Sequence, residues 1–330
     1  MNLKKNCLAV FLVLQLLVVL PSLAQTAESA STPHFTQLVK YLTLGTGSMS
    51  GTYFPLGNAF ANIWTLYSKN ISVMAHSTQG SIDNLNLMRR RELNLAIAQS
   101  DIVVSAIRGS GAFSGRALPD LKVVMALYPE VIQVVVMADS DIVNVGQLRG
   151  RRVVVGAPGS GNSKTAFELL EVCGIGAEDF EPVYISYDEA IQAMERREYD
   201  AAFIIAGIPT TMISELQKRR PVRIVPFTQS EIESLTGGLP YLSALSLPAA
   251  TYSGLDAEVK TVALMAMLVA EPGLSDDLVY RLCAGIYDNL GYLGKVHERA
   301  RDISLENFML GVSADYVHPG AARFYAERRR

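Results

Sequence analysis

Three segments in the first hundred residues share one pattern, in which a short apolar run leads into small polar residues and then into a helical pattern. The apolar runs end near residues 44, 75 and 98, and the polar loops that follow are residues 45–52, 77–81 and 99–101. Strands that alternate with helices indicate a parallel sheet. In such a sheet, ligands bind beyond the carboxyl ends of the strands. We therefore expect the three loops to meet at one crevice and to form a binding site.

The first loop, residues 45–52, is rich in glycine and in hydroxyl side chains. Glycine lets a ligand approach the backbone closely. The helix that begins near Tyr53 offers free N–H groups and a partial positive charge to an anion. A single loop of this kind is equally consistent with a structural turn. The argument for a site comes from the two further loops of the same kind.

A second α/β pattern occupies residues 132–228. A strand over 152–155 leads into residues 156–163 and a helix to Cys173, and a strand over 200–205 ends at residues 206–209. Before this unit, residues 121–138 are rich in strand formers. We interpret them as two strands, joined at residues 128–130, that cross from the first domain to the second. A simple hairpin is the alternative.

The remaining residues, 229–330, are predicted to be mostly helical, with helices over 257–269, 276–290 and 296–303. Only residues 241–247 look extended. This is too little sheet for a separate domain, so we expect the segment to complete the first one. The predicted organisation is an α/β protein with lobe I formed by residues 36–130 plus 229–330 and lobe II by residues 131–228.

The N-terminus is predicted to be a secretory signal peptide over residues 1–24. Lys4 and Lys5 supply its positive charge, residues 8–19 are apolar apart from Gln15, and small residues precede a cleavage point after Ala24. The alternative, a membrane anchor, is disfavoured because a span needs about 20 apolar residues. We expect cleavage, export to the periplasm and a soluble product.

Composition bounds the possible partners. A net charge of −3 and a pI near 5.9 give no electrostatic footprint for nucleic acid. Hydrophobic residues make up 49% of the chain and charged residues 18%, which is typical of a folded globular protein. Cys173 and Cys283 remain after cleavage, and they are either a disulfide pair or two buried thiols.

Motifs of several enzyme classes are absent from the sequence. Residues 156–161 fit the glycine spacing of a P-loop, but Asn162 stands where a P-loop needs lysine. Residues 47–51 carry Met49 in place of the serine of a nucleophile elbow, and residues 45–51 are one residue too long for a dinucleotide fingerprint. The four histidines lack zinc-site spacing. We expect a binding protein with no cofactor and no metal, and not an enzyme.

Several stretches of the chain carry a family resemblance. In chain order they are residues 45–47 and 51–57, Ser77–Ser81 with Asn84 and Leu85, Gln99–Asp101, Leu127–Glu130, Leu148–Val153, Gly156–Gly161, Asp200–Phe203, and His318–Ala322 with Tyr325. On these stretches the chain resembles the TAXI-type solute-binding proteins of tripartite ATP-independent periplasmic (TRAP) transporters. The resemblance covers nearly all of the chain after residue 24.

This resemblance implies a type II periplasmic-binding-protein fold, with two α/β lobes joined by a two-strand hinge and the ligand in the cleft between them. It also implies a monomer that binds a small organic acid, glutamate-like or a C4/C5 dicarboxylate, and delivers it to a TRAP membrane subunit with fused small and large parts. Ser48, Met49, Ser50, Phe54 and Gln79 depart from the family pattern. An exported sensor that presents its ligand to a membrane receptor is the alternative function.

The candidate ligand-binding residues come from the polar loops of both units. They are Thr46, Gly47, Ser48, Tyr53, Thr78, Gln79, Gly80, Ser81, Gln99, Ser100, Tyr128, Ser160, Gly161, Asn162, Ser163, Gly207, Pro209 and Tyr241. Because these loops contain no arginine, we expect helix N-termini and hydroxyls to hold the ligand's carboxylates. For each hydroxyl the alternative is helix capping, and for Tyr53 and Tyr128 it is a place in the core.

Overall fold

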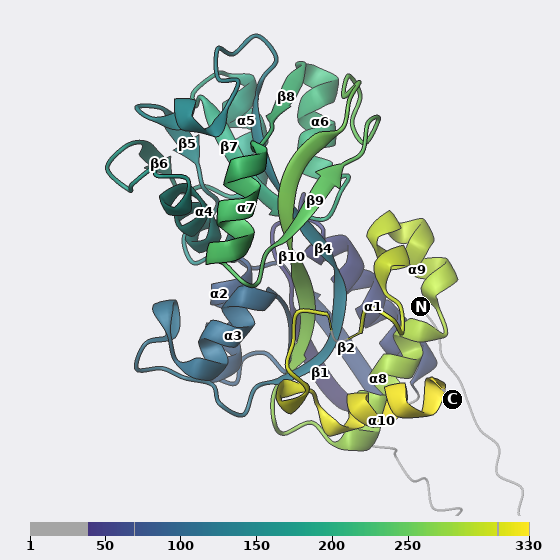
Figure 1. Cartoon of the computed structure of the whole chain (residues 1–330). Coiled ribbons are helices and arrows are strands. Elements are labelled where there is room, and N and C mark those ends of the chain that lie inside the picture. The colour runs from purple at the N-terminus through teal and green to yellow at the C-terminus, as the bar shows by residue number, and fades with distance from the viewer. Residues whose placement is uncertain (1–38, 69, 309, 330) are drawn as a thin grey trace, which may run out of the picture. The chain divides into compact units, whose positions relative to one another are not determined.

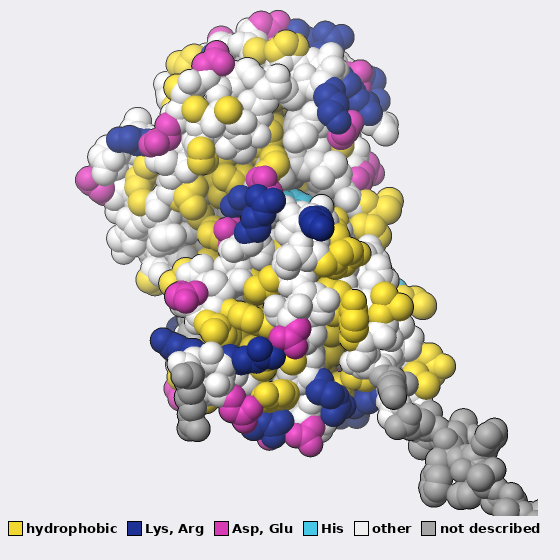
Figure 2. Space-filling view, turned by 90° about the vertical axis from the view of Figure 1, so that its right-hand side faces the viewer, with side chains coloured by type: hydrophobic (Ala, Val, Ile, Leu, Met, Phe, Trp, Pro, Cys, Tyr) yellow, Lys and Arg dark blue, Asp and Glu magenta, His cyan; other side chains and the backbone are white. Residues whose placement is uncertain are grey.

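The computed structural model describes residues 39–68, 70–308 and 310–329, which belong to one compact unit, Leu38–Arg330. The signal peptide predicted over residues 1–24 lies outside the described residues. In the described part, no helix is both long enough and apolar enough to span a membrane. Figure 2 shows one face of the molecule, on which positively and negatively charged side chains are interspersed.

Ten strands form one sheet. They are β1 (Lys40–Gly45), β2 (Ile71–His76), β3 (Leu95–Gln99), β4 (Lys122–Met137), β5 (Arg152–Val154), β6 (Glu181–Val183), β7 (Ala201–Ala206), β8 (Val222–Val225), β9 (Ser243–Leu247) and β10 (Val259–Ala270). The strand order is β2-β1-β3-β10-β4-β7-β5-β6, with β8 paired to β4 and β9 to β10. The pairs β1–β2, β1–β3, β5–β6 and β5–β7 are parallel, as the alternating pattern predicts.

Helices connect the strands and cover both faces of the sheet (Figure 1). They are α1 (Tyr53–Tyr67), α2 (Ser81–Arg89), α3 (Ser100–Arg108), α4 (Gly161–Val172), α5 (Tyr187–Glu195), α6 (Thr211–Arg219), α7 (Gln229–Gly238), α8 (Asp276–Tyr287), α9 (Leu290–Val296) and α10 (Pro319–Arg328). Four short 3-10 helices are η1 (Gly111–Phe113), η2 (Val145–Leu148), η3 (Glu298–Asp302) and η4 (Ala314–Tyr316). Hydroxyl side chains cap several of these helices; Ser186, for example, opens α5 in a capping box with Glu189.

The long strands β4 and β10 pair with each other in antiparallel register and run through the whole sheet (Figure 1). The carboxyl half of β10 pairs with β3, whereas its first half pairs with β9. The second half of β4 pairs with β7 and β8. Each of these two strands is therefore shared by two halves of the sheet, as expected of a double crossover.

Buried side chains form two pairs of clusters, one pair around each half of the sheet. In the first half, α1, α8 and α10 pack on one face and α2 and α3 on the other. In the second half, α4 and α7 pack on one face and α5 and α6 on the other. Ile232, Leu242 and Tyr252 pack with the second pair of clusters, although the predicted lobe I includes all of residues 229–330. The place at which a hinge divides the lobes remains a prediction.

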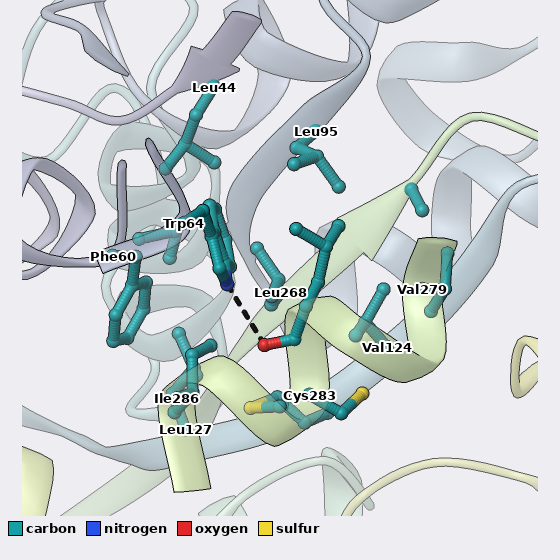
Figure 3. Packing of buried hydrophobic residues seen from close by; sticks show 14 of the residues in the cluster. Leu44, Phe60, Trp64, Leu95, Val124, Leu127, Leu268, Val279, Cys283 and Ile286 are labelled. Carbon is teal, nitrogen blue, oxygen red and sulfur yellow. Dashed lines mark hydrogen bonds between the residues drawn. The ribbon is translucent and has the colours of Figure 1, made fainter. Parts of the chain in front are cut away.

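Trp64 anchors the first half. Its indole is 1% exposed and donates a hydrogen bond from Nε1 to the carbonyl of Leu282 at 2.9 Å, which ties α1 to α8 (Figure 3). Phe60, Cys283 and Ile286 are fully buried in the same cluster. Because a buried indole N–H needs a partner, this bond fixes how the two helices pack.

Two sequence-based predictions were wrong. The helix predicted over residues 257–269 is absent there, and Val259–Ala270 form strand β10, because an apolar run rich in alanine, leucine and methionine does not distinguish a buried strand from a buried helix. Residues 121–138 form one continuous strand, β4, and not two. Pro129 lies inside this strand opposite Met265, where the prediction placed a break.

The sequence left open whether Cys173 and Cys283 form a disulfide, and in the structure both are free thiols. Cys173 is half-buried and Cys283 is buried. Burial raises the pKa of Cys173 to about 12, with a smaller contribution from Glu231, so its thiol is unreactive at neutral pH. Within the described residues, no group of three or more His, Cys, Asp or Glu side chains is arranged to hold a metal ion.

Candidate functional site

The polar loops of both halves surround one cavity of about 230 Å³. Its lining residues are Gly47, Ser48, Gly51, Thr52, Tyr53, Ser77, Thr78, Gln79, Gly80, Ser81, Gln99, Glu130, Gly156, Ala157, Ser160, Gly161, Asn162, Ser186, Tyr187, Asp188, Ile205 and Ala206. All of them except Glu130 lie at the carboxyl end of a strand or in the segment that follows it, at β1, β2, β3, β5, β6 or β7. Glu130 lies within β4. The volume lies below the usual range of 300–1,000 Å³ for drug-sized ligands, so the cavity suits a small one.

Two buried asparagines hold the strand ends around the cavity. In the first half, Asn84 donates from Nδ2 to the carbonyls of Thr46 and Ile97, at 2.7 and 2.9 Å. In the second half, Asn162 donates to the carbonyls of Val155 and Phe203, at 2.5 and 3.0 Å. Each amide thus connects the residue that follows one strand to a residue within a second strand: Asn84 connects β1 to β3, and Asn162 connects β5 to β7.

Eleven of the eighteen residues predicted from the sequence line the cavity. They are Gly47, Ser48, Tyr53, Thr78, Gln79, Gly80, Ser81, Gln99, Ser160, Gly161 and Asn162. Gly80 has a backbone φ of 106°, which residues with a side chain rarely adopt. It is the N-cap residue of α2 and offers no side-chain cap. The backbone of this loop lines the cavity at Gly80.

The other seven predicted residues lie outside the lining: Thr46, Ser100, Tyr128, Ser163, Gly207, Pro209 and Tyr241. Thr46 is buried and donates to the carbonyl of His76 at 2.6 Å. Tyr128 is fully buried in the core. Ser163 takes part in the cap of α4 through its N–H, which donates to Ser160 Oγ at 3.1 Å. The Tyr241 hydroxyl donates to Glu168. Packing and capping account for these four.

Sequence reasoning missed the contribution of α5 to the cavity. Tyr187 and Asp188 line it, although residues 188–197 look like an ordinary surface helix. The available signal was the order of strand, Ser186 and helix, which repeats the pattern of the first three loops. Glu130 was also missed, because it lies inside strand β4 and the sequence does not give its distance to Tyr53 or to the cavity.

Glu130 brings a buried carboxyl group to the cavity. It is 2% exposed, and Tyr53 donates its hydroxyl hydrogen to Glu130 Oε2 at 2.8 Å. Burial raises the pKa of Glu130 to about 8, because desolvation penalises the charged form more than the Tyr53 hydrogen bond stabilises it. Burial and Glu130 also raise the pKa of Tyr53 well above its usual value, so the phenol stays a donor. Glu130 therefore changes its charge state near physiological pH.

Gln99 is the second unusual group. It is 3% exposed, it lines the cavity, and neither Nε2 nor Oε1 has a hydrogen-bond partner in the described residues. A Cβ atom at Gly161 would lie 1.6 Å from Gln99 Oε1, so any larger residue at the start of α4 would force the Gln99 side chain to move. An unpaired buried polar group costs about 1–3 kcal/mol. This amide is therefore available to a ligand.

Side chains also tie the two halves together across the cavity. Asp188 accepts hydrogen bonds from Ser48 Oγ at 2.5 Å and from the Ser50 N–H at 3.1 Å. Asp101 at the start of α3 accepts from Lys164 Nζ and Thr165 Oγ1 of α4, both at 3.0 Å. We call these two groups of contacts the cross-cavity ties. They connect the first loop to α5, and α3 to α4.

The sheet, its double crossover and the position of the cavity define a periplasmic-binding-protein fold, and solved structures support this class. The ligand-binding component of an ABC-type import system from Staphylococcus aureus, with zinc bound, is similar with a TM-score of 0.53 and 10% identity over 86% of this chain and 98% of that one. A protein from Bordetella bronchiseptica RB50 is similar with a TM-score of 0.52 and 14% identity over 88% and 98%.

A family model gives the narrower assignment: the chain belongs to the NMT1-like family, whose model matches residues 44–328. The matched segment begins in β1 and ends with α10, so it includes every residue that lines the cavity.

Proposed function

We propose that the protein is an exported solute-binding receptor. It captures a small organic acid or amino acid in the cavity and delivers it to a TRAP membrane subunit for uptake driven by an ion gradient. In this proposal the two halves of the sheet are two lobes, β4 and β10 form the hinge, and the cross-cavity ties close the lobes over the ligand. The resemblance of the loop sequences to TAXI-type proteins supports the TRAP partner.

The observation that carries this proposal is the unpaired amide of Gln99. It lies in a cavity between two sets of loops, next to the first residue of α4. α2 begins at the cavity without a side-chain cap and with Asp83 in its first turn, and Ser160 caps α4 by accepting from the Ser163 N–H. Free N–H groups and an unpaired amide suit the carboxylate of a small acid.

A thermal-shift screen tests the binding function. The chain from Gln25 onward is refolded to remove any ligand and is then mixed with single amino acids and dicarboxylates. A ligand at 100 times its Kd adds about 2.7 kcal/mol of stability. We expect a clear upward shift of the melting temperature with at least one of these acids. If none of them shifts it, the assignment to small organic acids is wrong.

The TRAP partner is tested separately by uptake into membrane vesicles that contain the candidate membrane subunit. We expect uptake of the bound acid to require both the receptor and an ion gradient. Uptake that continues after the gradient is collapsed but needs ATP contradicts this part of the proposal and leaves the binding function intact.

Replacing Gln99 by leucine is expected to change stability and binding in opposite directions. The unliganded variant gains about 1–3 kcal/mol in unfolding free energy, because an unpaired buried amide is removed. Its ligand affinity falls at least tenfold, because the ligand loses its partner. Urea unfolding and isothermal titration calorimetry measure the two effects.

Gln147→Leu is the matched control for this variant. Gln147 lies outside the cavity lining, and its Oε1 accepts from the Val143 and Asn144 N–H groups at 2.7 and 3.2 Å. It is expected to lose stability and to bind the ligand like the wild type. Unchanged affinity in Gln99→Leu contradicts the role given to Gln99.

A further inference from the structure

The cavity is lined by acidic side chains and by none that are basic. Among its lining residues, Glu130 and Asp188 carry carboxyl groups, and no lysine, arginine or histidine is present. Asp188 is already hydrogen-bonded to Ser48 and Ser50. Lys164, on α4 behind the cavity, is bonded to Asp101 and Glu168 at 3.0 and 2.7 Å. A ligand in this cavity therefore meets two carboxyl groups and no lysine, arginine or histidine side chain of the lining.

We propose that Glu130 determines specificity by holding a positively charged amino group of the ligand, so that the cavity takes an amino acid and rejects the dicarboxylate that lacks the amine. This inference rests on the proposed receptor function. It selects between two ligand classes that the loops alone leave open, because hydroxyls and helix N-termini receive a carboxylate from either of them.

The geometry of Glu130 supports this role. Tyr53 donates to Oε2, and no hydrogen bond from any described residue reaches Oε1. The carboxyl group is buried, yet it belongs to the cavity lining. A primary ammonium has three donors, and a buried carboxylate is stabilised when it is paired with such a group. An ammonium ion at Oε1 would thus complete the hydrogen bonding of a group that the protein leaves half-paired.

The neighbours of Glu130 place a carboxylate site beside it. The Ser81 side chain lies close enough to Tyr53 to act on the pKa of that phenol, which burial and Glu130 raise. Ser81 is the first residue of α2 and lines the cavity. Its Oγ accepts from the backbone N–H of Gln99 at 3.1 Å, which places it beside the residue whose side-chain amide is unpaired. The amino and carboxylate groups of an amino acid are attached to one carbon, so adjacent sites of opposite polarity suit them.

The two ligand classes predict opposite pH trends. Tyr53 of α1 and Asp101 of α3 affect the pKa of Glu130, and Glu130 in turn raises the pKa of Tyr128 in β4 and of Tyr187 in α5. An ammonium group needs ionised Glu130, so amino acid binding releases a proton and tightens as the pH rises from 6 to 8. A carboxylate beside Glu130 needs the protonated form, so dicarboxylate binding would weaken over the same range.

Calorimetric titration of the refolded chain with matched ligand pairs tests the proposal. Each pair consists of an amino acid and the same skeleton without the amine: glutamate and glutarate, aspartate and succinate, leucine and 4-methylpentanoate. We expect the preferred amino acid to bind at least 30-fold more tightly than its partner and to release a proton, measured in two buffers of different ionisation enthalpy. A dicarboxylate that binds as tightly as its amino acid overturns the proposal while the receptor function stands. Absence of binding by every compound overturns both.

Glu130→Gln provides the second test. It keeps an acceptor for Tyr53 but removes the charge, so we expect amino acid affinity to fall at least 50-fold and glutarate affinity to change less than threefold. The matched control is Glu271→Gln, because Glu271 bonds Asn94 at 2.7 Å and lies outside the lining; it should bind like the wild type. Wild-type affinity in Glu130→Gln overturns the proposal. If that variant does not fold, the pH dependence of amino acid affinity and the proton release of the wild type test the proposal instead.

Discussion

Replacing Asn162 by alanine is expected to lower the free energy of unfolding by about 3–5 kcal/mol, because each buried group left without a partner costs about 1–3 kcal/mol. The amide donates to Val155 and Phe203, and its Oδ1 accepts from the Ile205 N–H at 2.7 Å and from Tyr187 at 2.6 Å. Alanine removes all four of these hydrogen bonds. The ends of β5 and β7 then lose the side chain that bridges them.

Chemical denaturation at pH 7 measures this loss, and Asn58→Ala is the matched control. Asn58 makes one hydrogen bond, from Nδ2 to the Phe54 carbonyl one turn earlier in α1, so its loss should cost about 1 kcal/mol or less. Equal effects of the two substitutions would show that Asn162 is not a brace for the strand ends. Asn162 lines the cavity, so the variant should also bind ligand more weakly.

The unliganded protein is expected to lose stability as the pH rises from about 5 to about 8. Glu130 has a pKa raised to about 8 by burial. In the unfolded chain a glutamate titrates near 4.3. Between these values the folded state binds one more proton than the unfolded state, so stability falls with increasing pH. The slope from this group is at most about 1.4 kcal/mol per pH unit.

Glu130→Gln isolates this contribution, since burial also raises the pKa of Asp101 and gives it a slope of the same sign. Unfolding free energies measured from pH 5 to pH 8 should fall less steeply in the variant than in the wild type. The variant should also be the more stable of the two at pH 8, by about 4–5 kcal/mol for the full shift. Parallel curves for the two proteins would mean that Glu130 stays ionised in the folded state.

The sequence predicted the parallel parts of the sheet because their pattern is local. Strand, small polar loop and helix follow one another within about 25 residues at β1, β2, β3 and β5, and the structure has all four units. The prediction was wrong at β10, where residues 262–270 are apolar and buried on both faces. Burial between β3 and β4 removes the alternation that distinguishes a strand, so only tertiary contacts reveal it.

The cavity could be predicted in part for the same reason. Residues such as Gly80, Gln99 and Gly161 follow strand ends, and position in the chain alone indicates the crevice. Glu130 lies in the middle of β4, and Asp188 opens a helix of the other half. Their places at the cavity depend on how β4 crosses the sheet and how the halves face each other. A sequence pattern of about ten residues carries no information on the path of β4 or on how the two halves face each other.

The cross-cavity ties have a consequence for how a membrane partner recognises a loaded receptor. Asp188 with Ser48, and Asp101 with Lys164, join the halves through the protein's own side chains, and neither contact includes a solute atom. In the proposed receptor, closure alone would then not tell the membrane subunit whether a solute is bound. The unpaired Gln99 amide penalises closure without a solute by about 1–3 kcal/mol, which makes the empty closed form roughly 5 to 150 times rarer than it would be with a paired amide. In the proposed receptor, this unsatisfied side chain would thus disfavour the empty closed form.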